Sequence, residues 1–320
     1  MKILVVQNRM GIGDTVIFLP FIKALSKKFD SPISLLVKEN SKADQYLFQT
    51  SYIDQILILE RDKKTKNKHN GFFGSLNLIK DIKKHKFDKI IIFNSSFRFY
   101  LIAKFARIPE IYQYPLFKKN KQHIIDTPKK FVKENFNLNI NNDPEIQIDS
   151  NLISKSAEKF QINLNETNIL LGIGGSGPSK RIPAKIFLEV IDKISRVRKC
   201  KFFLATGKND QEQIILNEIL KSKFKNLCKP LDNFMIKETL PIIKNCNISI
   251  CNDSSFSHLS AALGIKTITL MADTPLIYGN YSSKMFPIIP DGEETVTHNT
   301  YGKNRISSQK IFDKFIQIIN

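Results

Sequence analysis

The chain has 320 residues, a formal net charge of +19, and 42% hydrophobic and 25% charged residues. This length predicts about two domains, and the composition excludes a disordered chain. No apolar run approaches the roughly 20 residues that span a bilayer. The first residues have the pattern of a strand and not that of a signal peptide, so we expect a cytoplasmic protein. The four cysteines and five histidines lack metal-ligand spacing, which predicts reduced thiols and no metal site.

The first elements are a strand at residues 2–6, a Gly-bearing turn at 8–14 and a helix. The apolar residues of this helix recur at spacings of three and four and share one face: Phe18, Phe21, Ile22, Leu25 and Phe29. Asp14 closes the turn, where a carboxylate at the end of a strand can act as a general base. An aspartate in this position can also serve as the helix N-cap, and the segment alone leaves both roles open.

Strand-like and helical runs alternate along the rest of the chain, which predicts parallel sheets with helices on both faces. The strands are expected at 3–6, 33–37, 56–59, 89–93, 169–173, 201–205, 248–251 and 267–270, and further helices at 185–194, 211–220, 255–263 and 306–319. The Asn-rich stretch 137–150 reads as a linker. We therefore predict two Rossmann-like domains, 1–145 and 146–320, which face one another across a cleft. The final helix, 306–319, belongs to the second domain or packs back on the first.

The positive charge is concentrated in the second half of the first domain. Residues 61–133 contain 19 Lys/Arg and 5 Asp/Glu, a net charge of +14, with lysine pairs at 63–64, 83–84, 118–119 and 129–130. Such a region suits nucleic acid, anionic lipid headgroups or a phosphorylated substrate. The alternative is a solvated lysine-rich surface, which explains single lysines better than their concentration here.

Two segments of the second domain carry candidate phosphate ligands. The loop with Gly174, Gly175 and Ser176 precedes Lys180 and Arg181, and Pro183 is expected at the first helical position. Glycines let backbone N–H groups approach an anion, and the two cations can neutralise phosphate oxygens. Taken alone, this loop is equally a flexible connection.

The second segment, Asn252 to Gly264, follows a strand. Asp253 or Ser254 can cap the helix there, which leaves its first N–H groups available to a phosphate. His258 lies about one turn further along and can reach the same ligand. A structural histidine is the alternative, but in this context we prefer a ligand role.

These segments, in this order, resemble the ADP-heptose:lipopolysaccharide heptosyltransferases of glycosyltransferase family 9. The matching residues are Arg9, Gly13-Asp14 and Pro20, then Lys180-Arg181-Ile182-Pro183, Asn252 to Ala262, and Met271 to Pro275. The chain departs from the family pattern at Ser255, where glycine is usual, and at Ile182, where the family has tryptophan. These departures concern the identity of the donor more than the fold or the reaction class.

The resemblance implies a GT-B fold and an inverting, metal-independent transfer without a cofactor, in which a sugar, heptose from ADP-heptose, moves to a lipopolysaccharide core or related glycan. It implies that Asp14 is the general base, with Arg9 and Gly13 on the acceptor side. The residues that it assigns to the nucleotide-sugar donor are Gly174, Gly175, Ser176, Lys180, Arg181, Asp210, Glu212, Asp253, Ser254, Ser255 and His258. Asp210 and Glu212 are alternatives for the acidic residue that binds the donor ribose.

The expected partners are therefore a nucleotide-sugar, a glycolipid or glycan acceptor and the anionic inner face of the cytoplasmic membrane, with the chain acting as a monomer. A nucleotide-sugar epimerase or hydrolase of the same fold is the alternative enzyme, although no second set of acid and base residues is evident. A non-catalytic nucleotide-sugar-binding homologue is a third reading, supported only by Ser255. We do not expect nucleic-acid binding, because no basic-aromatic stacking module is present.

Overall fold

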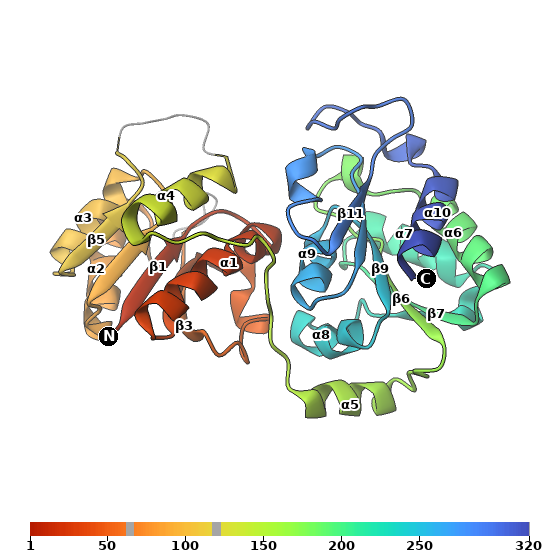
Figure 1. The fold of residues 1–320 in the computed structure, drawn as a ribbon, viewed down its shortest axis with the longest axis horizontal. Helices are drawn as coiled ribbons and strands as arrows, with labels where there is room; N and C mark the ends of the chain where they lie inside the picture. Colours follow the sequence, from red (N-terminus) through yellow and green to blue (C-terminus); the bar gives the residue numbers. More distant parts are fainter. Residues whose placement is uncertain (62–66, 117–122, 320) are drawn as a thin grey trace. The chain divides into compact units, whose positions relative to one another are not determined.

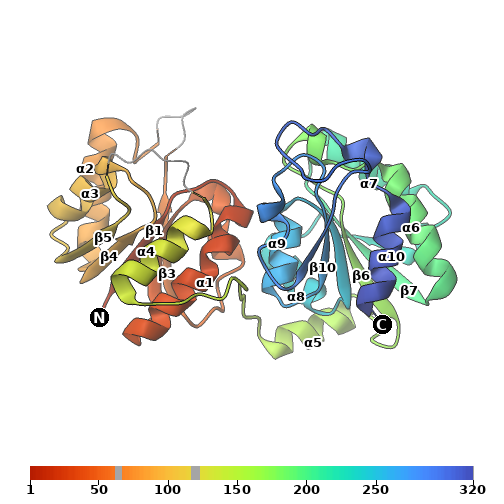
Figure 2. The ribbon, with the colours of Figure 1, turned by 45° about the horizontal axis from the view of Figure 1, so that its top comes forward.

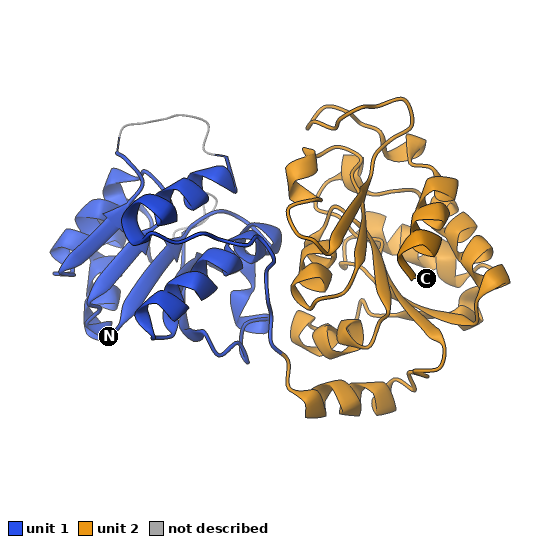
Figure 3. Cartoon of the chain, viewed as in Figure 1, with its two compact units in different colours: residues 1–147 blue, residues 148–320 orange. Residues whose placement is uncertain are grey.

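The computed structural model describes residues 1–61, 67–116 and 123–319, so the lysine pairs at 63–64 and 118–119 lie outside the described residues. The chain divides into two compact units, Met1–Gln147 and Ile148–Asn320 (Figure 3). The sequence-based boundary, between residues 145 and 146, lies two residues before this division. Each unit is a parallel sheet with helices on both faces, as predicted from the alternating pattern.

Unit 1 contains a five-stranded sheet in the order β3-β2-β1-β4-β5, and its paired strands run parallel. The strands are β1 Ile3–Gln7, β2 Ile33–Lys38, β3 Ile53–Leu59, β4 Lys89–Ile92 and β5 Glu110–Gln113. The central strand β1 is buried throughout, as expected for a strand covered on both faces. The sequence analysis missed β5, an edge strand that contains only one aliphatic residue, Ile111.

The helices of unit 1 cover both faces of this sheet (Figures 1 and 2). They are α1 Ile12–Phe29, α2 Gly71–His85, α3 Phe97–Phe105 and α4 Asp126–Phe136. Helices α2 and α3 pack on one face through a shared core that includes Leu78, Ile82, Phe99 and Ile102. Helix α1 lies on the opposite face and buries the side predicted from its periodicity, including Phe18 and Leu25.

Unit 2 contains a six-stranded parallel sheet in the order β11-β10-β9-β6-β7-β8. The strands are β6 Thr167–Gly172, β7 Cys200–Ala205, β8 Cys228–Pro230, β9 Ile248–Asn252, β10 Thr267–Leu270 and β11 Met285–Ile288. The sequence analysis missed β8 and β11, which are the two edges of the sheet. Each contains a proline, a residue tolerated at edges because its missing N–H leaves no ladder bond unmade there.

The helices of unit 2 are α5 Ser150–Lys159, α6 Ala184–Val197, α7 Asp210–Leu220, α8 Ile236–Lys244, α9 Ser255–Ala262 and α10 Ser308–Ile319. Figure 1 shows α6, α7 and α10 on one side of the sheet and α8 and α9 on the other. Helix α10 packs against α6 and buries Ile311 and Phe315 in the core of unit 2. Of the two alternatives for the final helix, the structure supports the first: the helix is part of the core of unit 2.

The Asn-rich linker is fixed at its end to unit 1. Lys23 forms an ion pair with Glu145, and the Tyr52 hydroxyl donates to the Glu145 carbonyl oxygen. The backbone N–H of Ser51 donates to Gln147 Oε1 at 2.8 Å. These contacts explain why the boundary between the units falls at residue 147 and not in the middle of the Asn-rich stretch.

Candidate functional site

Asp14 lies at the carboxyl end of strand β1, in the first turn of α1. The N-cap of this helix is Gly11, which has φ +96° and ψ 164°. The alternative prediction that Asp14 is the N-cap is therefore wrong. Asp14 is the third residue of α1 and so belongs to its first turn, at the positive end of the helix dipole. Its backbone carbonyl oxygen accepts a hydrogen bond from Gln7 Nε2 at 3.2 Å, which ties the turn to the end of the strand.

Arg9 and Gly13, expected on the acceptor side, are neighbours of Asp14 in the same turn. The N–H of Arg9 donates to Gln7 Oε1 at 3.1 Å, and Gly13 is the second residue of α1. Burial raises the pKa of Tyr114, just after β5, and the nearby charge of Arg9 opposes that rise. Arg9, Gly13 and Asp14 therefore belong to one polar edge, formed where the strands of unit 1 end.

In unit 2 the glycine-rich loop after β6 is held by hydrogen bonds from three sides. The N–H of Gly175 donates to Glu212 Oε1 at 2.7 Å, and Arg181 Nε donates to the Gly175 carbonyl oxygen at 2.9 Å. Asn252 Nδ2 donates to the carbonyl oxygen of Ile173 at 2.8 Å. The loop is therefore fixed in place, and the alternative of a flexible connection does not describe it.

Close packing explains why Gly174 is a glycine. A Cβ at this position would lie 2.6 Å from Glu212 Oε1 and 3.1 Å from Thr206 Oγ1. Gly177, two residues beyond Gly175, has nothing within 4 Å of the corresponding point. Space is therefore restricted at the buried end of the loop and open at its exposed end, where Ser176 also lies.

Glu212 and Asp210, the two alternatives for a ribose ligand, have different environments. Glu212 is buried, and its two carboxylate oxygens accept from Gly175 and from the side chain of Asn209. Asp210 is the exposed first residue of α7. Arg181, predicted as a phosphate ligand, donates to the loop and to the Gln211 side chain. Glu212 and Arg181 thus support the loop, a role that the sequence did not reveal.

Lys180 and Asp253, 73 residues apart in the chain, form an ion pair with 2.6 Å between Nζ and Oδ2. The Asp253 side chain is 6% exposed, and that of Lys180 is 24% exposed. Burial disfavours the ionised form of Asp253, but the ammonium of Lys180 outweighs this effect and lowers the pKa of the carboxyl group. The two segments predicted separately from the sequence therefore meet in one site. Pro183, expected at the first helical position, is instead the N-cap of α6.

His258 is buried against the same carboxylate, with 3.9 Å between its Nε2 and Asp253 Oδ1. Its Nδ1 lies 3.0 Å from the hydroxyl of Tyr281, and the two rings stack with their centroids 5.6 Å apart. Burial lowers the pKa of His258 to about 4, so the ring is neutral near pH 7. Sequence reasoning missed Tyr281, which follows the short turn after β10 and belongs to no periodic pattern.

Helix α9 starts where strand β9 ends, with Ser254 as its N-cap and Ser255 as its first residue. Ser255 has ordinary helical backbone, so a residue other than glycine causes no strain at this position. Among the described residues, three buried polar atoms near the ends of β7 and β9 have no hydrogen-bond partner: Thr206 Oγ1, Asn252 Oδ1 and Ser254 Oγ. Buried polar groups are normally satisfied, so unpaired atoms at this edge suit a polar ligand.

Within residues 1–61, 67–116 and 123–319, no group of three or more His, Cys, Asp or Glu side chains is arranged to hold a metal ion. Over the same residues, no helix is both long and apolar enough to cross a membrane.

The fold and the site together define a two-unit α/β protein with polar residues at the carboxyl ends of both sheets, where such folds bind their ligands. A family model for glycosyltransferase family 9 (heptosyltransferase) matches residues 75–310. The chain belongs to this family, and it is therefore a glycosyltransferase.

Curated relatives agree with this assignment. The chain is 27% identical over 259 residues to lipooligosaccharide heptosyltransferase 2 of Campylobacter jejuni, an alignment that covers 76% of this chain and 77% of that one. It is 28% identical over 151 residues to lipopolysaccharide heptosyltransferase 1 of Campylobacter coli, covering 46% and 44%.

Solved structures confirm the predicted GT-B fold. The family 9 glycosyltransferase from Veillonella parvula matches with a TM-score of 0.80 at 20% identity, over 99% of this chain and 97% of that one. The E. coli ADP-heptose lps heptosyltransferase II matches with a TM-score of 0.73 at 17% identity, over 100% and 98%. The fold alone does not fix the reaction, since a UDP-GlcNAc 2-epimerase from Methanocaldococcus jannaschii also matches, with a TM-score of 0.51 at 14% identity over 100% and 93%.

Proposed function

We propose that this glycosyltransferase moves heptose from ADP-heptose to a hydroxyl group of a lipopolysaccharide or lipooligosaccharide core. The observation that carries the proposal is the Lys180–Asp253–His258 cluster beside the glycine-rich loop. It combines a cation for phosphate with a fixed carboxylate and a neutral imidazole, which suit sugar hydroxyls. Family membership and the Campylobacter relatives support the choice of heptose.

Unit 2 is proposed to bind the donor. The exposed part of Lys180 would interact with a diphosphate oxygen, and the first N–H groups of α9 would face the same group. Asp253 would accept hydrogen bonds from sugar hydroxyls. Ser254 Oγ and Thr206 Oγ1, unpaired within the described structure, would find their partners on the nucleotide-sugar.

Unit 1 is proposed to bind the acceptor and to supply Asp14 as the general base. Asp14 takes the proton of the acceptor hydroxyl while that oxygen forms a bond to C1 of the sugar. The bond between C1 and the diphosphate oxygen breaks, and both its electrons leave with ADP. Attack opposite the leaving group inverts the anomeric centre. Positive charge and oriented N–H groups stabilise the departing diphosphate, which is the role often filled by a metal.

The proposed setting is the inner face of the cytoplasmic membrane, with the chain acting as a monomer. The acceptor would be a lipid-anchored glycan, whose phosphate groups suit the basic second half of unit 1.

Asp14→Asn is the decisive substitution. Loss of a general base typically lowers a rate by about 10²–10⁴-fold, so we expect kcat to fall by at least about 100-fold. Because Asp14 belongs to unit 1, the increase in thermal stability produced by ADP-heptose is expected to stay unchanged. Asp126→Asn is the matched control, since Asp126 is also in the first turn of a helix of unit 1 but has a 76% exposed side chain.

Full activity of Asp14→Asn would overturn the mechanism. Release of ADP at the same rate with and without acceptor would favour a hydrolase, and conversion of the nucleotide-sugar into an isomer would favour an epimerase. A rate abolished by EDTA would contradict metal independence.

A further inference from the structure

Helix α3 exposes a continuous apolar stripe. Phe97, Leu101 and Phe105 follow one another at intervals of four residues and therefore share one side of the helix. Phe97 is 48% and Phe105 is 64% exposed, although the opposite side of the same helix is buried in the core of unit 1. Exposed apolar residues on ordinary protein surfaces are scattered singly, whereas this helix of nine residues exposes three large ones.

Helix α2, the neighbour of α3 on the same face of the sheet, exposes a second set at its start. Phe72 and Phe73 are 75% and 78% exposed, and their rings contact each other with centroids 5.9 Å apart. Leu76 follows on the same side of the helix. We call the six residues of the two helices the α2–α3 apolar face: Phe72, Phe73, Leu76, Phe97, Leu101 and Phe105.

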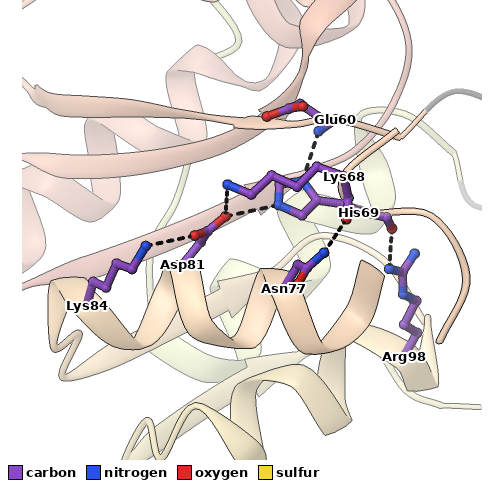
Figure 4. A network of polar contacts seen from close by, with 7 residues as sticks. All are labelled: Glu60, Lys68, His69, Asn77, Asp81, Lys84 and Arg98. Atoms are coloured by element: carbon purple, nitrogen blue, oxygen red, sulfur yellow. Dashed lines mark hydrogen bonds and ion pairs between the residues drawn. The ribbon is translucent and has the colours of Figure 1, made fainter. Parts of the chain in front are cut away.

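A polar network fixes the two helices to each other (Figure 4). Arg98 on α3 donates from Nη2 to the carbonyl oxygen of His69 at 2.6 Å and from Nε to Ser75 Oγ on α2 at 2.9 Å. His69 is buried, accepts the N–H of Glu60 at Nδ1 and lies 3.2 Å from Asp81 Oδ2 through Nε2. The start of α2, which carries Phe72 and Phe73, is thus held in place on the sheet.

Positive charge flanks this face towards the carboxyl-terminal ends of both helices. The acidic residue of the two helices is Asp81, which forms ion pairs with Lys68 and Lys84. Exposed cations lie at the ends of the apolar stripes, namely Lys80 and Lys83 on α2, Lys104 on α3 and Arg107 just beyond it. Their long apolar stems can lie along a lipid surface while the charged ends reach the headgroups.

We propose that the α2–α3 apolar face docks unit 1 onto an anionic lipid surface. Exposed phenylalanines that enter the boundary between headgroups and acyl chains, flanked by lysines that meet anionic headgroups, are the features of interfacial membrane binding. A second copy of the chain fits less well, because pairing two such faces brings like charges together. This inference rests on the proposed function, since it supplies the surface on which a lipid-anchored acceptor is met.

The test uses the full-length protein and sedimentation with vesicles of phosphatidylcholine, alone or mixed with phosphatidylglycerol. We expect binding to the mixed vesicles and little binding to the neutral ones. The variant Phe72→Ser/Phe73→Ser/Phe105→Ser should bind mixed vesicles at least about tenfold more weakly, because its apolar contact is removed. Lys80→Glu/Lys83→Glu should also weaken binding and its dependence on salt.

Leu164→Ser/Val197→Ser is the matched control, because it removes two side chains of unit 2 that are 68% and 56% exposed. It should bind vesicles like the wild type. All variants should keep the circular dichroism spectrum and melting temperature of the wild type. The triple phenylalanine variant and the control should also transfer sugar normally to a water-soluble, deacylated acceptor.

Unchanged vesicle binding by the triple phenylalanine variant would overturn the proposal, as would equal binding of the wild type to neutral and mixed vesicles. A dimer in solution that this variant separates would assign the face to a second copy. Failure of transfer to the soluble acceptor in the wild type would refute the proposed function without affecting the docking result.

Discussion

Acidification is expected to destabilise the protein through His258. Burial lowers the pKa of this histidine to about 4, whereas an unfolded chain has a pKa of about 6.5. Between these values the unfolded state binds a proton that the folded state excludes. As far as His258 is concerned, the free energy of unfolding is therefore highest above about pH 6.5. It falls as the pH drops towards 4, because the unfolded state gains a proton there and the folded state does not.

The size of this loss follows from the two pKa values. At pH 5 the unfolded imidazole is almost fully protonated and the folded one is mostly neutral, which lowers the free energy of unfolding by ~2 kcal/mol relative to pH 7.5. Asp253 does not oppose this change, because its lowered pKa keeps it ionised over the same range. For a unit of this size, ~2 kcal/mol corresponds to a fall in melting temperature of about 4–8 °C.

The assay is thermal unfolding of the wild type and of His258→Asn at pH 7.5 and pH 5. The asparagine keeps a polar atom facing the Tyr281 hydroxyl but does not titrate. The wild type should lose about 4–8 °C more than the variant between the two conditions, because the other titrating groups are common to both proteins. An equal fall in both proteins would refute the assignment of His258 as a buried neutral histidine.

Two further predictions concern packing in unit 2 and the thiols. Gly174→Ala should lower the free energy of unfolding by about 1–3 kcal/mol in chemical denaturation, since its methyl group would overlap Glu212 Oε1. Gly177→Ala, whose Cβ would meet nothing within 4 Å, is the matched control, and an equal cost for both would contradict the packing argument. All four cysteines are buried and unpaired, and burial raises the pKa of each thiol, that of Cys251 to about 12. Iodoacetamide should therefore label none of them in the native protein and all four in urea, and rapid native labelling would be inconsistent with this structure.

The fold was predictable where burial leaves a strong pattern. The central strands, such as β1 and β9, are apolar runs covered on both faces, and the sequence located them within one or two residues. An edge strand has a neighbouring strand along only one of its edges and is less fully covered, so its residues need not be apolar. Strand β5, with the sequence Glu-Ile-Tyr-Gln, therefore carries no signal that distinguishes it from a loop.

The site was predictable in its segments but not in the assignments within them. The sequence placed Lys180 and Asp253 in two segments that each follow a strand of the second domain. The structure makes these strands, β6 and β9, neighbours and joins the two side chains in an ion pair. The sequence could not distinguish Glu212 from Asp210. Glu212 lies on α7 and supports the loop, whereas Asp210, two residues earlier, is exposed. That difference depends on which side chain reaches the N–H of Gly175, a contact between residues 37 positions apart.

The fixed glycine-rich loop has a consequence for the kinetics of ligand exchange. Hydrogen bonds from Glu212 on α7, from Asn252 at the end of β9 and from Arg181 just before α6 hold its backbone. Binding at such a loop requires little ordering of the chain, so little conformational entropy is lost when a ligand arrives. We therefore expect the loop to have its nucleotide-binding conformation before the nucleotide binds. Its residence time would then depend on the contacts that it makes, and not on a rearrangement of the loop.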